Sequence, residues 1–243
     1  MDVLEREQIS NRVLSGHWYY ESKFRLLRKH ISRLPLPTAS FSSVDVGSGL
    51  GLFLHKMERH GLASPDRSIG VDPAYEAPRH AFESQIVIYP DFPAGRQFDL
   101  LVLMDVLEHV EDDAEVLKNA LRHALPGGYV FITVPALPAL WSSHDRFLGH
   151  YRRYTLKTLN SLVEKTGALE VLDTHYFFAG ILPLAAPVRL LRSRTAEPRT
   201  SDMKALSGVA NALLKLFCTA ELVVAGLNKT AGLTAVMLCK VKR

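Results

Sequence analysis

The chain has few cysteines and no cysteine pattern that marks a metal or redox site. Cys218 and Cys239 are the only two in 243 residues, and no C-x-x-C pair occurs. A zinc ribbon, a thioredoxin-like redox motif and a disulfide framework are therefore excluded. A chain without such a framework suits a reducing compartment, so we expect a cytoplasmic location.

Long apolar runs and blocks of like charge are also scarce. No run is apolar enough over the length of a membrane span, and the charged residues 1–6 do not resemble a signal peptide. The net charge is +4, but the basic residues form no long block. This balance favours an anionic substrate or surface only slightly, and we expect no nucleic-acid partner.

The chain does contain enough apolar residues, 47%, for one sizeable core in a single domain. Segments whose apolar residues recur at helical spacing alternate with short, continuous apolar runs. This alternation is typical of a parallel, doubly wound sheet. The runs predict strands near residues 43–46, 68–72, 85–89, 98–105, 129–135, 169–176 and 234–241.

The most informative stretch joins a buried strand to a glycine-rich turn and then a helix. Residues 44–46 are followed by Gly47-Ser48-Gly49-Leu50-Gly51 and by apolar residues at helical spacing. Glycine lacks Cβ, so a ligand can approach the backbone, and the start of a helix favours a carboxylate or phosphate. An NAD-type fingerprint requires glycine where this chain has Leu52.

The acid-x-Gly-x-Gly-x-Gly pattern that begins at Asp45 resembles the first motif of class I S-adenosylmethionine-dependent methyltransferases. The resemblance runs from Val44 to Gly128 and includes an Asp-x-x-Glu-His segment at 105–109 and Leu-Pro-Gly-Gly at 125–128. It implies an α/β, Rossmann-like fold of three layers. The sheet would have seven strands, parallel except for the last, and S-adenosylmethionine would be the cofactor.

By this resemblance, the cofactor lies at the carboxyl ends of the strands. The glycine motif would hold its methionine portion, and Asp72 at the end of the second strand would accept hydrogen bonds from the ribose hydroxyls. The segment after Tyr89, which would pass the adenine, departs from the family pattern. The residues expected to bind the cofactor are Tyr20, Asp45, Gly47, Ser48, Gly49, Gly51, Asp72, Pro73, Tyr89, Asp91, Met104 and Asp105.

A second stretch, Trp-Ser-x-His-Asp followed by Gly-His-x-Arg-Arg-Tyr-Thr over 141–155, resembles a signature of one bacterial methyltransferase subgroup of type 11/12-like sequences. The aromatic segment 17–20 resembles the N-terminal helix of the same subgroup. The loop after the fifth strand leaves the carboxyl edge of the sheet, where open α/β sheets bind ligands. The expected catalytic residues are His144, Asp145, His150 and Tyr154.

Among these, we prefer His144 to His150 as the base, because histidine titrates near neutral pH and Asp145 is adjacent. The aromatic residues would roof the acceptor pocket, and Arg152 could hold an anionic group. Structural salt bridges are the alternative for Arg152 and Arg153. The residues expected to bind the acceptor are Trp18, Tyr19, His109, Trp141 and Arg152.

Four residues, Asp105, Glu108, His109 and Asp112, would share one face if this segment is helical. Some O-methyltransferases of ubiquinone biosynthesis and small-RNA 2′-O-methyltransferases bind a magnesium-like metal with acids and a histidine at this spacing. Oxygen ligands of this kind suit a hard divalent cation. The alternative is that Glu108 and His109 only orient the loop. We expect no metal.

We divide the single domain into a helical cap (1–37), a cofactor-binding core (38–176), a helical insert (177–228) and a last strand (229–243). The insert suits a lid, a homodimer contact, a peripheral membrane contact or simple packing. The predicted reaction is O- or C-methylation of a small-molecule, lipid- or carrier-linked acceptor, in cell-surface glycan, lipid or secondary-metabolite biosynthesis. The alternatives are an NAD(P)-dependent oxidoreductase and a non-catalytic adaptor with the same fold.

Overall fold

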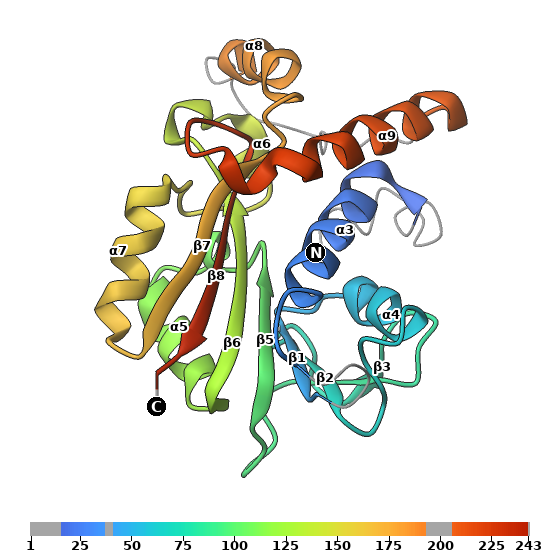
Figure 1. Cartoon of the computed structure of the whole chain (residues 1–243), viewed down its shortest axis with the longest axis vertical. Helices are drawn as coiled ribbons and strands as arrows, with labels where there is room; N and C mark the ends of the chain where they lie inside the picture. Colours follow the sequence, from blue (N-terminus) through green and yellow to red (C-terminus); the bar gives the residue numbers. More distant parts are fainter. Residues whose placement is uncertain (1–15, 37–40, 193–205, 243) are drawn as a thin grey trace.

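The computed structural model describes residues 16–36, 41–192 and 206–242. Its centre is one eight-stranded sheet with the strand order β3-β4-β2-β1-β5-β6-β8-β7 (Figure 1). The strands are β1 (Ser43–Val46), β2 (Ser68–Val71), β3 (Arg79–His80), β4 (Val87–Tyr89), β5 (Phe98–Met104), β6 (Ala124–Pro135), β7 (Leu169–Phe177) and β8 (Thr234–Val241).

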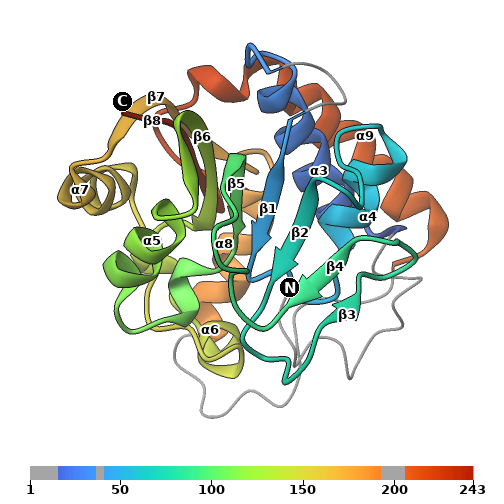
Figure 2. The ribbon, with the colours of Figure 1, turned by 90° about the horizontal axis from the view of Figure 1, so that it is seen from below.

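The sheet is parallel from β4 through β6, and β8 is antiparallel to both β6 and β7. The expectation of seven strands is wrong by one strand, because the sheet has eight. Arg79 and His80 form a two-residue strand that pairs antiparallel with β4 at the edge of the sheet (Figure 2). Two exposed residues are too short to show the alternation that marks a strand in sequence.

Helices cover both faces of the sheet, which explains why β5 is buried along almost its whole length. Leu100, Val102 and Met104 belong to the core beneath α3, α4 and α9, and Leu101 and Leu103 to the core beneath α5 and α7. The helices are α3 (Trp18–Ile31), α4 (Leu52–Arg59), α5 (Asp113–Leu121), α6 (Ser143–Phe147), α7 (Leu156–Thr166), α8 (Leu182–Arg192) and α9 (Gly208–Val224).

Local chemistry sets several helix ends. The Thr155 side chain caps α7 by accepting from the Thr158 backbone N–H, and Gly167 ends this helix with a φ of +65°. Asp112 caps α5 instead of lying on a helix face. Of the expected helical cap (1–37), residues 1–15 and 37 lie outside the described chain, as do residues 193–205 of the expected insert.

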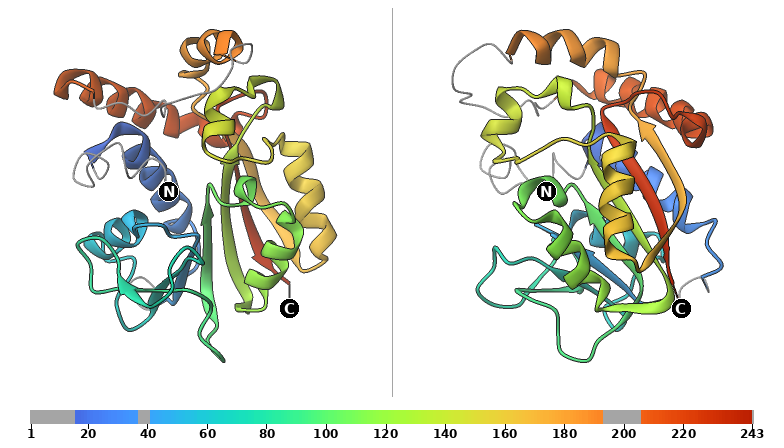
Figure 3. Two further views of the ribbon diagram at one scale, coloured as in Figure 1. Left: turned by 180° about the vertical axis from the view of Figure 1, so that it is seen from behind. Right: turned by 90° about the vertical axis from the view of Figure 1, so that its left-hand side faces the viewer.

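The insert before β8 places α8 and α9 together at one end of the molecule (Figures 1 and 3). Cys218 and Leu222 of α9 are buried, and this helix packs on α3. With the short helix η3 (Ala225–Leu227), α9 forms a segment of 20 residues that is long and apolar enough to cross a membrane by length and composition, and most of it is not buried. The expectation that no segment is apolar enough over a spanning length is therefore wrong. The isolated charges of Lys215 and Glu221 hide this segment in the sequence.

Candidate active site

The glycine turn between β1 and α4 needs glycine for its conformation and for its packing. Gly47, Gly49 and Gly51 have φ values of +66°, +54° and +76°, which side chains rarely adopt. A Cβ at Gly47 would lie 2.7 Å from Cγ2 of Val106. Gly51 is the N-cap of α4 and supplies no side-chain hydrogen bond, so the positive end of the helix faces the turn.

Asp72 ties the end of β2 to this turn. Its Oδ2 accepts a hydrogen bond of 2.6 Å from the Gly49 backbone N–H, and its Oδ1 accepts one of 3.0 Å from Ala74. The Tyr75 hydroxyl donates to the Gly49 carbonyl over 2.8 Å. A carboxylate can accept about four hydrogen bonds. Asp72 can therefore accept the bonds from Gly49 and Ala74 and still accept two more from a pair of neighbouring hydroxyl groups.

Asp45 and Ser48 leave buried polar atoms without a hydrogen bond beside the same turn. Asp45 Oδ2 and Ser48 Oγ are both buried and have no hydrogen-bond partner. Burial, together with the nearby charge of Asp72, raises the pKa of Asp45 to about 7. Unsatisfied polar groups of this kind fit a site that a polar ligand completes.

The remaining residues expected around the cofactor lie on the loops that follow β2 and β4. Pro73 is exposed directly after Asp72. The Tyr89 carbonyl accepts from the Asp72 backbone N–H over 2.9 Å, which places the end of β4 beside the end of β2. Asp91 is exposed, and its Oδ1 accepts from Phe92 over 2.7 Å.

A fully buried lysine that the sequence analysis missed pairs with Asp105 at the end of β5. Lys23 Nζ donates to Asp105 Oδ2 and, over 3.2 Å, to Thr133 Oγ1, while the Tyr19 hydroxyl donates to the same carboxylate over 3.1 Å. Burial alone would raise the pKa of Asp105, but Lys23 and these hydrogen bonds lower it overall. Asp105 has a left-handed φ of +57°.

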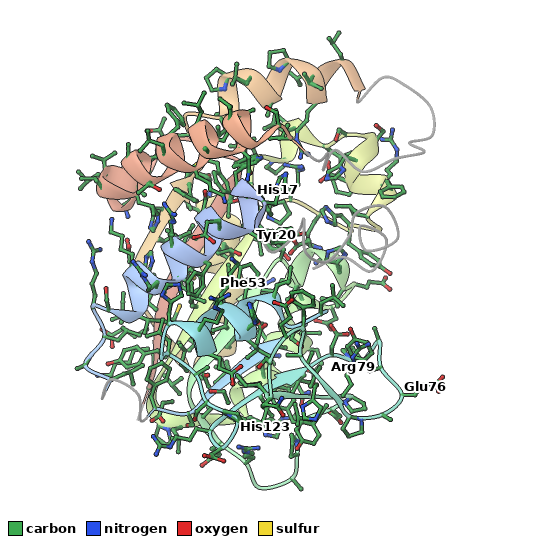
Figure 4. All side chains as sticks on the ribbon, turned by 90° about the vertical axis from the view of Figure 1, so that its right-hand side faces the viewer. His17, Tyr20, Phe53, Glu76, Arg79 and His123 are labelled. Carbon is green, nitrogen blue, oxygen red and sulfur yellow. The ribbon has the colours of Figure 1, made fainter. Side chains whose placement is uncertain are left out.

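A cavity of about 630 Å³ lies beside this ion pair, between the start of α3, the ends of β5 and β6, and helices α6, α8 and α9. His17 at the N-cap of α3, Tyr20 of α3 and Phe53 of α4 line it, and Figure 4 labels these three from the start of α3 toward α4. Of the residues expected at the site, the cavity is lined by Trp18, Tyr19, Tyr20, Met104, Asp105, His109, His144 and His150.

Asp145 is wholly buried and binds His150 at the wall of the cavity. Its Oδ1 accepts from Arg153 Nε over 2.7 Å and lies 3.1 Å from His150 Nδ1. Its Oδ2 accepts from the backbone N–H and the hydroxyl of Ser142. Burial alone would raise the pKa of Asp145, but His150, Arg153 and the more distant Arg189 lower it well below its ordinary value. Asp145 is therefore a fixed anion.

The structure brings some of the expected acceptor residues together and separates others. His144 lines the cavity and is buried. Tyr154 does not line it: its hydroxyl donates to Asp113 over 2.7 Å, and burial raises its pKa. Nη1 of Arg152 lies 3.2 Å from Oδ2 of Asp113, and its Nη2 donates to backbone carbonyls. Arg152 therefore forms the structural salt bridge that was the alternative to acceptor binding. Trp141 is half-buried and also lies outside the lining.

Glu108, His109 and His150 offer donor atoms that all lie within 4.8 Å of one another. Glu108 is buried, and its Oε2 has no hydrogen-bond partner. Burial and the charge of Asp105 raise the pKa of Glu108 well above its ordinary value. One carboxylate and two imidazoles fit a divalent cation. Asp145 would not bind the cation itself but would orient His150 through its hydrogen bond to Nδ1. Asp105 and Asp112 do not belong to this cluster.

Comparisons with known proteins agree with the fold. Residues 19–172 match the model of the family described as methyltransferase domain. The chain is 30% identical over 147 residues to a ubiquinone biosynthesis O-methyltransferase of Sodalis glossinidius, covering 53% of this chain and 58% of that protein. A protein of the same name from Methylobacterium sp. is 35% identical over 117 residues, covering 42% of this chain and 45% of the other.

Solved structures share the fold at low identity. A chain in the complex of the Haloferax volcanii Trm112 methyltransferase activator with a methyltransferase has a TM-score of 0.57 at 15% identity, covering 100% of this chain and 99% of that one. The plantazolicin methyltransferase BpumL bound to SAH has a TM-score of 0.53 at 13% identity, covering 96% and 87%.

The fold is thus the Rossmann-like fold of class I methyltransferases. The chain belongs to the methyltransferase domain family, whose model covers more than half of its residues. It spans little more than half the length of the first curated relatives that it matches. The family match ends at residue 172, before α8 and α9.

Proposed function

We propose that the protein transfers a methyl group from S-adenosylmethionine to an acceptor bound in the 630 Å³ cavity. The observation that carries this proposal is the left-handed glycine turn and Asp72 at one sheet edge, with Phe53 of the helix that follows the turn lining the cavity. The names of the sequence relatives support oxygen as the acceptor atom, with carbon as the alternative. We also propose a cytoplasmic location.

The sulfonium of the cofactor is already activated, so the protein mainly has to align the two reactants and exclude water. The methionine portion would lie over the glycine turn and reach toward Met104 and Asp105, which line the cavity. Trp18, Tyr19 and Tyr20 form the apolar wall on the α3 side. These rings would keep water from the reacting centre.

His150 is the base that this geometry favours, in place of His144. When Nδ1 carries the proton and donates to Asp145, Nε2 is left as the basic nitrogen. The anionic Asp145 would then stabilise the imidazolium that forms when Nε2 takes the acceptor proton. Arg153 and Ser142 hold Asp145 in place.

The cluster of Glu108, His109 and His150 supports a second way to activate the acceptor. A divalent cation held by these three residues would lower the pKa of a hydroxyl that binds to it. The unpartnered Glu108 Oε2 is the observation that favours this alternative. Turnover that survives exhaustive chelation would exclude it, and restoration by Mg²⁺ or Mn²⁺ after chelation would support it.

The cofactor proposal can be tested with two glycine variants matched in backbone conformation. Gly47→Ala should abolish calorimetric binding of S-adenosylhomocysteine, because the new Cβ enters the turn 2.7 Å from Val106. Gly61→Ala carries the same left-handed strain, with φ of +68°, but its Cβ meets no atom within 4 Å. It should bind normally. Equal affinity in both variants would refute the assignment of the turn.

A further inference from the structure

Exposed apolar side chains gather on the insert. Among the described residues, twelve of the fifteen large hydrophobic side chains that are exposed lie between 184 and 227. We call the exposed side chains of α8, α9 and η3 the α8–α9 apolar surface. Leu184, Leu191, Leu216, Val223 and Leu227 are between 68% and 83% exposed on it. An exposed apolar surface of this kind is typical of a protein or membrane contact.

The exposed side of α9 is continuous and without charge. Its apolar residues recur at intervals of four and three residues, while Cys218 and Leu222 on the other side are buried. The acid of this helix, Glu221, points inward and accepts from the backbone N–H groups of Ala179 and Gly180. The exposed stripe consists of Val209, Leu213, Leu216, Ala220, Val223 and Leu227.

Polar contacts hold α9 against the rest of the protein, so it lies along the surface rather than crossing a membrane. Asn211 accepts from the Trp18 backbone N–H over 2.7 Å and donates to the Gly16 carbonyl over 3.0 Å. Arg25 donates to Thr219, and Lys29 donates to the Leu222 carbonyl. These contacts fix one side of α9 on α3 and leave the opposite stripe outward.

The cavity reaches this same surface. Leu184 and Val188 of α8 line the cavity and are 70% and 45% exposed. Leu214 of α9 also lines it. The cavity wall therefore continues into the α8–α9 apolar surface at these residues, while the guanidinium of Arg189, also in the lining, lies 3.6 Å from Asp145. A ligand with an apolar chain could pass between the cavity and this surface.

A lipid bilayer fits this surface better than a second copy of the chain. A partner helix seated on the α9 stripe would be expected to find charges beside the seam, but the flanking positions hold Ala210, Ala212, Phe217, Thr219 and Val224. It would also leave the exposed leucines of α8 uncovered. A bilayer can cover both helices at once.

We propose that the α8–α9 apolar surface docks peripherally on a lipid bilayer, so that the cavity receives an amphiphile with a long acyl or prenyl chain. The docking stands independently of catalysis, whereas the identity of the acceptor rests on the proposed methyl transfer. Because the exposed stripe is uncharged, binding should persist on zwitterionic vesicles and should depend little on salt.

Flotation of the full chain with phosphatidylcholine vesicles tests the docking. The unchanged protein should float, and the double variant Leu213→Glu/Leu216→Glu should float at least tenfold less. Leu172→Glu is the matched control, because Leu172 is 45% exposed on β7, outside this surface. It should float like the unchanged protein. Calorimetry with S-adenosylhomocysteine checks folding of each variant and fails separately if the cofactor proposal is wrong.

A tryptophan reporter gives a second measurement that introduces no charge. Leu216→Trp should be quenched by vesicles with brominated acyl chains, beyond the quenching of the natural tryptophans, and Leu172→Trp should not. Equal flotation of the double variant and the unchanged protein would overturn the proposal. So would a stable dimer in light scattering that the double variant dissociates, or binding limited to anionic vesicles and lost in salt.

Discussion

Charged residues in the site are held by partners of opposite charge. Lys23 and Asp105 are 82 positions apart, whereas Asp145 binds His150 and Arg153, which follow it by five and eight positions. Lys23, Asp145 and Arg153 are buried, and Asp105 is partly buried. Removing one member leaves the other uncompensated, which is the costly change for a buried pair.

Lys23→Met should therefore lower the free energy of unfolding by about 3–5 kcal/mol. The fall comes from the Asp105 carboxylate, which keeps the Tyr19 hydrogen bond but loses its cation, rather than from lost packing, since methionine fills a similar volume. Adding Asp105→Asn should recover part of the loss, because asparagine tolerates the left-handed φ of +57° without a charge. Urea unfolding measures both. A double variant less stable than Lys23→Met would contradict this account.

His150→Ala should reduce turnover by about 10² to 10⁴-fold and leave S-adenosylhomocysteine affinity unchanged. His144→Ala should cost less, because the fixed anion Asp145 binds His150. The measurement is methyl transfer from labelled cofactor to the acceptor identified by mass spectrometry. The opposite ranking of the two variants would restore His144 as the base.

The sequence predicts the cofactor side of the site better than the acceptor side. The glycine turn and Asp72 are local patterns at strand ends, and parallel strands bring such ends together. Tyr154 and Arg152 are near His150 in sequence, but the backbone turns their side chains toward α5. Lys23 gives one usable signal, a lysine among the apolar residues of α3 that face the core.

At the scale of elements, the attachment of α9 to α3 decides how well the cavity wall is held. Asn211 supplies both a donor and an acceptor near the start of α9. The strands and most helices could be predicted because their apolar periods are regular. The place of α9 could not, because both of its sides are apolar and periodicity does not show which side is buried.

Asn211→Ala should loosen the first turns of α9 by about 1–2 kcal/mol, through loss of two hydrogen bonds. Hydrogen exchange of the α9 amides should rise while exchange in β5 stays unchanged. Asn211→Asp is the matched variant, since it keeps the acceptor for Trp18 and loses the donor to Gly16. Its α9 amides should exchange faster than those of the unchanged protein and more slowly than those of Asn211→Ala. Uniform protection in all three proteins would show that the bridge is dispensable.

At the scale of the whole molecule, stability should decline in acid because of a partly buried cluster between α3 and β7. Asp173 Oδ2 lies 3.4 Å from His30 Nε2 and 3.2 Å from His175 Nδ1, and Lys229 lies 3.3 Å from Oδ1. Burial lowers the pKa of His175. Burial alone would raise the pKa of Asp173, but the two histidines and Lys229 lower it overall.

Both lowered pKa values give stability that is present at neutral pH and lost as the pH falls. The contribution of His175 should decline below about pH 6.5, and that of Asp173 below about pH 4, where the unfolded chain takes up protons. Urea unfolding between pH 5 and 7 should therefore show a shallower slope for His175→Phe. His80→Gln, at an exposed histidine, should keep the original slope. Parallel slopes in all three proteins would disprove the role of the cluster.

The strand order has a consequence for how the protein is made. β8 lies between β6 and β7, so β7 has no neighbour in the sheet until residues 234–241 leave the ribosome. Until then, the nascent chain presents unpaired edges on β6 and β7 together with α8 and α9. Translation should therefore yield a compact β1–β6 unit early, and a protease-resistant complete sheet only after residues 234–241 have left the ribosomal exit tunnel.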